Sequence, residues 1–273
     1  MDERSALQWF FKDFDPLSYA RQAQLIASSK QCDVSVSVDD QPSFDDGFSH
    51  ESWKRISIRR IRVIQAELFF EILCGIGATG FPWRHEKPIL FERWSCILRD
   101  ISRGVSPSIF QENFQQELAV RDFLKICFFG RFIDEDIFSE AHLKAIALEA
   151  SLVSDRAFIN SVKHGAVQVA CQFSVEIENV DGPSIDLSRE GILHFSFDHK
   201  SGELLSSFEA VDWRDDVSRI WFMALMLKCL VDVRCEVYNN RRPIKFRFPE
   251  APNFGAQVGI NSLKLRTKES TIV

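Results

Sequence analysis

The residues of this chain best suited to chemistry lie in one short run, residues 155–165. Steps of three and four residues return to the same face of a helix, so four polar residues of the run are predicted to share one side. They are Arg156, Asn160, Lys163 and His164. The opposite side carries apolar residues that suit a hydrophobic core: Leu148, Leu152, Ile159 and Val162.

These polar groups have the chemistry of metal-independent RNA cleavage. That reaction needs a base for the 2′-hydroxyl proton, an acid for the leaving oxygen, and cations for the charge that develops on phosphorus. His164 can move protons near neutral pH, while Arg156 and Lys163 can stabilise phosphate charge. Asn160 would orient the imidazole or the scissile phosphate.

An ordinary helix end accounts for the same residues. Lys163 and His164 would fall in the last turn, where cations interact favourably with the negative end of the helix dipole. Gly165 would then be the residue that lets the chain leave the helix. The sequence leaves both interpretations open.

Two further basic clusters are candidates for nucleic-acid binding. Arg55, Arg59 and Arg62 share a helical face and could follow a phosphate backbone. The alternative is a solvated helix face, offset by the acidic residues 1–50. Arg241 and Arg242 could extend a basic groove, or could belong to a charged edge strand that resists aggregation.

Hydrophobic periodicity predicts the elements that would position these residues. Helices are expected at 52–74, ended by Gly75 and Gly77, at 89–101, from Ser106-Pro107 to about 129, and at 139–163. Alternating stretches predict strands at 166–180, 191–197 and 203–210, with a further edge strand at 244–248. In 191–197 the side of the strand that carries His194 is expected to be a hydrophilic, solvated sheet face. Asp212 and Asp215 are expected to cap an apolar helix over 215–238.

The predicted fold class is therefore α+β and mainly α. It is a helical bundle with an inserted antiparallel β-hairpin or small sheet and a long C-terminal apolar helix that packs back into the bundle. The expected organisation is a lead-in segment with a mobile loop at 1–50, one domain at 51–250 with its β insertion at about 166–210, and a basic polar tail at 251–273.

Composition narrows the class of protein. The chain has 273 residues, 45% of them hydrophobic, and a formal net charge of −6, which argues against steering of nucleic acid by the whole molecule. Its seven cysteines are odd in number and show no CxxC spacing, a pattern typical of a reduced compartment. No cofactor or metal site is predicted, and no apolar run reaches membrane-spanning length. We therefore expect a cytoplasmic protein without a membrane partner.

The order of elements and the run Asn160-Ser-Val-Lys-His164-Gly165 resemble the HEPN superfamily (higher eukaryotes and prokaryotes nucleotide-binding). Its motif is an arginine, four to six residues, and a histidine near a helix end. Here seven residues separate Arg156 from His164, and Ala157 follows the arginine, so the run is similar to a variant of that motif. The resemblance covers residues 52–165 and 215–238.

The resemblance implies a fold, a reaction class and partners. It implies a helical bundle that pairs into a homodimer or with a protein partner. It also implies RNA binding or endoribonuclease activity in a toxin–antitoxin or antiviral defence system, without a cofactor. The alternative is a non-catalytic sensor, assembly or inhibitor subunit in which residues 160–165 are a structural helix cap.

Overall fold

A computed structural model describes the following parts of the chain. They are residues 14–30, 50–79, 89–107, 119–129, 136–154, 159, 168–173, 176–177, 185–186, 189–198, 203–238, 248–251 and 262–266. The helices in these ranges are α2 (Ser18–Ser28), α3 (His50–Thr79), α4 (Ile89–Ser102), α6 (Val120–Phe129), α7 (Glu140–Ser154) and α9 (Trp213–Tyr238). The strands are β1 (Gln168–Phe173), β2 (Glu176–Ile177), β3 (Ile185–Asp186), β4 (Arg189–Asp198), β5 (Glu203–Ala210) and β6 (Ser262–Arg266). A mainly helical α+β protein is thereby confirmed.

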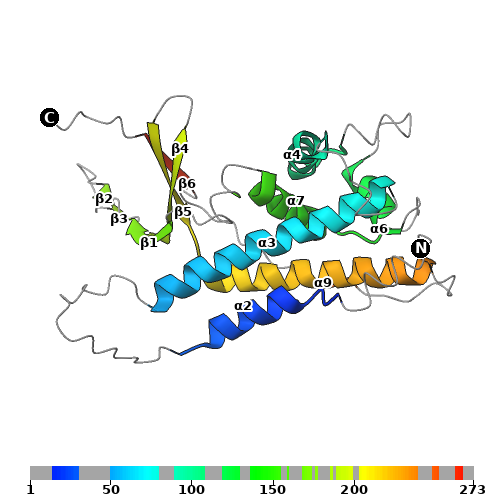
Figure 1. Ribbon diagram of the computed structural model, residues 1–273, viewed down its shortest axis with the longest axis horizontal. Coiled ribbons are helices and arrows are strands. Elements are labelled where there is room, and N and C mark those ends of the chain that lie inside the picture. The colour runs from blue at the N-terminus through cyan, green and yellow to red at the C-terminus, as the bar shows by residue number, and fades with distance from the viewer. Residues whose placement is uncertain are drawn as a thin grey trace.

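The two longest helices form the axis of the molecule. Helices α3 and α9 pack along each other, and α2 packs against both (Figure 1). Helices α4, α6 and α7 gather around the C-terminal half of α3, whereas the sheet lies over its N-terminal half (Figure 1). Helix α3 therefore contacts both the other helices and the sheet.

The main sheet is antiparallel, in the strand order β1-β4-β5-β6. His194 of β4 lies opposite Gln168 of β1 and Ser207 of β5. Strands β2 and β3 form a separate two-stranded sheet. Strand β6 was not predicted, because its residues fall in the segment expected to be a polar tail; five of them pair with β5. Of the predicted edge strand at 244–248, only Phe248 is described, and it is not in a strand.

Gly191 allows β4 to pack closely against β5. A Cβ atom placed on Gly191 would lie 2.6 Å from the ring of Phe208 and would overlap the carbonyl oxygen of Glu209. A side chain at position 191 would therefore displace the aromatic ring that covers the glycine.

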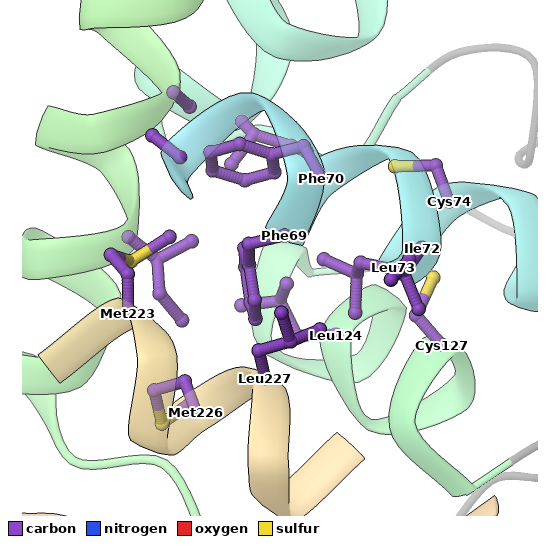
Figure 2. Close-up of a cluster of buried hydrophobic side chains, with 14 of the residues drawn as sticks. Phe69, Phe70, Ile72, Leu73, Cys74, Leu124, Cys127, Met223, Met226 and Leu227 are labelled. Carbon is purple, nitrogen blue, oxygen red and sulfur yellow. The ribbon is translucent and has the colours of Figure 1, made fainter. Parts of the chain in front are cut away.

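The hydrophobic core lies between α3, α4, α6, α7 and α9. Phe69 and Leu73 of α3 meet Leu124 of α6, with Met223 and Leu227 of α9 beside them (Figure 2). Part of the predicted core face of α7 is wrong, because Leu148 is 38% exposed, whereas Glu149 beside it is buried. Leu152 packs against the core and Ile159 is fully buried in it, as predicted.

Two predicted helix ends also differ from the structure. Helix α3 continues through Gly75 and Gly77 to Thr79. Glycine costs about 1 kcal/mol in a helix relative to alanine, which disfavours the helix without ending it. The helix expected from Ser106 is seen from Val120 to Phe129, and residues 108–118 lie outside the described ranges. Asp212 caps α9 as predicted: its carboxylate accepts the Arg214 backbone N–H at 2.9 Å.

Candidate functional site

The four residues of the predicted cleavage site lie outside the described part of the chain. These are Arg156, Asn160, Lys163 and His164, and the same holds for Arg241 and Arg242. Ile159 is the one described residue of the run; it is helical and 0% exposed. The run is therefore attached to the hydrophobic core at Ile159.

The arginines predicted to bind nucleic acid from α3 are buried. Arg55, Arg59 and Arg62 are 7%, 5% and 7% exposed. The alternative of a solvated face is therefore wrong: this side of α3 is covered by the sheet and by α7 and α9. All three guanidinium groups are bound to carboxylates, and these ion pairs would have to open before a phosphate backbone could reach them.

Arg62 is held by the helical body. Its Nε and Nη2 donate to the two carboxylate oxygens of Glu149 on α7, at 2.9 and 2.7 Å. Its Nη1 donates to Asp216 Oδ1 on α9, at 2.6 Å. Glu149 and Asp216 are themselves 1% and 2% exposed. Arg219 of α9 also lies beside Glu149, with an N–O distance of 3.6 Å. This is a buried, bidentate ion-pair cluster that joins three helices.

Arg59 links this cluster to the sheet. Its Nη1 donates to the same Asp216 Oδ1 at 2.8 Å, and its other nitrogens donate to the carboxylate of Glu209 on β5. Asp216 Oδ1 therefore accepts hydrogen bonds from two guanidinium groups, those of Arg59 and Arg62, which lie one turn apart on α3. The buried charges alternate between cations and anions, so that each lies in direct contact with an opposite charge.

The remaining partners come from the other strands. Arg55 pairs with Glu190 of β4, and Arg60 donates from Nε to Gln168 Oε1 of β1 at 2.9 Å. Gln168 Nε2 lies 3.2 Å from His194 Nδ1, and His194 Nε2 lies 3.6 Å from Glu209 Oε2.

His194 is 4% exposed, so the prediction that its side of the strand faces solvent is wrong. Alternation separated the two faces correctly, but the polar face turns inward because α3 presents arginines there beside Ile56.

The electrostatics of the cluster show which contacts dominate. Burial alone would raise the pKa of Glu209, but Arg59 and the contact with His194 outweigh it and hold the pKa at about 2. Burial would lower the pKa of the Arg62 guanidinium, but Glu149 and Asp216 raise it above its ordinary value. Both groups are therefore charged over the whole neutral range.

The depressed pKa of Glu209 predicts a loss of stability in acid. The carboxyl has a pKa of 4.5 when unperturbed and about 2 in the folded protein, so its stabilising effect is present above pH 4.5 and is lost as the pH falls towards 2. The expected contribution is about 3 kcal/mol. Urea unfolding from pH 6 to 2 should show a shallower acid loss in Glu209→Gln than in the unchanged protein. Parallel curves for the two proteins would contradict this assignment.

Sequence reasoning missed the acidic half of the cluster, namely Glu149, Glu190, Glu209 and Asp216. In helix α7, the sequence did carry a sign that a charged residue would be buried. Glu149 lies on the same face as Ala145, Ile146 and Val153, and a lone charge among apolar residues on one helical face indicates a buried partner. For the two strand residues we find no comparable signal.

The described residues offer the ion-pair cluster but no group of three or more His, Cys, Asp or Glu placed to hold a metal ion. Among the described helices, none combines the length and apolar character that crossing a bilayer requires. Comparisons with family models, curated proteins and solved structures found no match for this chain.

Proposed function

We propose that this protein is a non-catalytic, HEPN-like sensor, assembly or inhibitor subunit that acts through a protein partner or a second copy of itself. The observation that carries the proposal is the pairing of Arg55, Arg59 and Arg62 with carboxylates of the same chain. Arg55 and Arg59, which were candidates for holding RNA, pair with the sheet instead, and Arg62 joins α3 to α7 and α9. On this proposal, α9 is the long apolar helix of a HEPN-like bundle, and residues 160–165 are a structural helix cap.

A buried ion-pair cluster suits such a role. Replacing buried ion pairs by apolar residues often leaves stability unchanged or raises it, so burial of charge alone does not explain the cluster as a source of stability. Directional pairs do select one orientation of the sheet on α3, and a protein that presents a surface to a partner requires a defined orientation.

The second candidate is a metal-independent endoribonuclease of a toxin–antitoxin or antiviral defence system. His164 would be the general acid and base, Arg156 and Lys163 would stabilise phosphate charge, and Asn160 would orient the reacting groups. In favour of it, the burial of Ile159 attaches this run to the rigid core, and a catalytic run requires a rigid support.

One assay separates the two functions. Purified protein is incubated with mixed RNA in EDTA, beside His164→Ala and the control His50→Ala, which removes a histidine at the start of α3. We expect no cleavage that depends on His164, and a loss of about 1 kcal/mol in the free energy of unfolding of His164→Ala as a helix-end cation is removed. Cleavage that survives in His50→Ala but falls by about 10²-fold or more in His164→Ala would establish the nuclease instead.

A further inference from the structure

The sheet covers the basic half of α3 with a polar and acidic face. Three successive strands each supply one acceptor to one arginine. Gln168 of β1 accepts from Arg60, Glu190 of β4 pairs with Arg55, and Glu209 of β5 pairs with Arg59. Arg62, further along the helix, has no strand partner and binds Glu149 of α7 and Asp216 of α9 instead.

Apolar contact contributes little to the same interface. The apolar cluster between α3 and the sheet consists of Ile56, Ile192 and Val211, with Ala170 against it. Among the described residues, the large core cluster includes side chains from α3, α4, α6, α7 and α9 but none from the sheet. The sheet is therefore attached mainly by charged and polar pairs, whereas the helices are attached to one another by apolar packing.

The two sets of pairs differ in how far solvent can reach them. The side chain of Glu190 is 67% exposed and that of Glu209 is 22% exposed, while Glu149 and Asp216 in the helical body are 1% and 3% exposed. The carboxylates of the sheet are therefore closer to solvent than those among the helices, but Arg55 and Arg59 are themselves buried, so the sheet has to move before a dissolved anion can reach them. Displacement of the sheet would free Arg55 and Arg60 and one side of Arg59, and would leave Arg62 bound to Glu149.

We infer that the sheet is a displaceable polar and acidic cover over an anion-binding face of α3. The phosphate groups of a polyanion would compete with Glu190 for Arg55, with Glu209 for Arg59 and with Gln168 for Arg60. A guanidinium group binds phosphate with the same planar fork that it uses for a carboxylate. The three arginines span about 8 Å of helix, which suits a chain of phosphates better than a single ion. This surface goes beyond the proposed interaction role and does not depend on it.

The experiment measures binding of two probes to the full chain at low salt, a 20-nucleotide single-stranded RNA and inorganic polyphosphate. Glu190→Gln/Glu209→Gln is expected to bind on the order of tenfold more tightly than the unchanged protein, because Arg55 loses its carboxylate partner and Arg59 keeps only Asp216. For the RNA, log K against log salt should have a slope of about −2, as expected for three neutralised phosphates on a single strand. Binding of both probes would identify the phosphate chain as the ligand, and binding of RNA alone would narrow it to nucleic acid; both outcomes support the inference.

Hydrogen exchange tests whether the sheet moves. Amides of β1, β4 and β5 should exchange faster when polyanion binds, while those of α6 and α7 should not change. Glu140→Gln is the matched control: it removes an exposed carboxylate partner of Arg121 on the helical body and should leave affinity unchanged. When Arg55→Gln and Arg60→Gln are added to Glu190→Gln/Glu209→Gln, the gain in polyanion affinity should be lost.

Three results would overturn the inference. One is a folded double variant with no gain in affinity; another is a gain that persists without Arg55 and Arg60; the third is tighter binding with no change of exchange in the sheet. If the double variant does not fold, Glu190→Gln alone is used, because that carboxylate is at the exposed rim. The single variant should show a smaller gain in affinity for both probes. An unchanged affinity would again contradict the inference that the sheet covers an anion-binding face of α3. Since the readout is binding, the result is independent of any RNA cleavage at His164.

Discussion

Glu149→Ala is expected to destabilise the protein by about 3–5 kcal/mol, because it leaves a buried charge without its partner. Glu149 is 1% exposed and binds Arg62 through both carboxylate oxygens, with Arg219 beside it. The alanine removes the anion but leaves the guanidinium groups where water cannot solvate them. The loss should appear as a lower urea midpoint with an unchanged slope, since the same surface is exposed on unfolding.

Glu140→Ala is the control for this change on the same helix. Glu140 pairs with Arg121, but its side chain is 87% exposed, so the loss should be at most about 1 kcal/mol. The joint replacement Arg62→Met/Glu149→Leu should be less damaging than Glu149→Ala alone, because both charges leave together. Equal effects of Glu149→Ala and Glu140→Ala would show that the cluster is solvated and that Arg62 is not held in a buried site.

How far the sequence predicts this fold depends on which interactions place each element. Apolar periodicity predicted the helices over 89–101 and 215–238 and the strands over 191–197 and 203–210, and the structure has α4, α9, β4 and β5 there. These elements are placed by local pattern and core packing, which a single sequence displays. Strand β6 does alternate, with Leu263 and Leu265 between polar residues, but the run is only five residues long and lies in a polar, basic segment, so it was assigned to the tail. In the structure it pairs with the edge of β5.

The charged cluster shows a second limit on what can be predicted from a single sequence. Arg55, Arg59 and Arg62 were recognised as one helical face, but the sequence could not say what faces them. Their partners lie between 87 and 157 residues further along the chain, on α7, α9, β4 and β5. A basic helical face looks the same in a sequence whether it faces solvent, a polyanion or the acidic side of its own sheet. For the run from Arg156 to His164, the structure adds the burial of Ile159, and the role of the polar residues stays a prediction.

The apolar half of α3 supplies the second large effect. Phe69→Ala is expected to cost about 3–5 kcal/mol, the range for removing a fully buried aromatic side chain. Phe69 is 0% exposed, and its ring centroid lies 5.1 Å from that of Phe70 and 6.3 Å from that of Phe128. Figure 2 shows it between α3 and α9, above Leu227 and near Leu124, so the cavity would open where three helices meet.

Two further variants make this result specific to core packing. Leu25→Ala removes an apolar side chain that is 70% exposed on α2 and should change stability by no more than about 0.5 kcal/mol. Phe69→Leu keeps most of the volume and should cost clearly less than the alanine, about 1–2 kcal/mol. A loss below about 1 kcal/mol for Phe69→Ala would mean that the helices can close over the missing ring. The core would then be loosely packed, and it would not be a rigid support for the sheet and for Ile159.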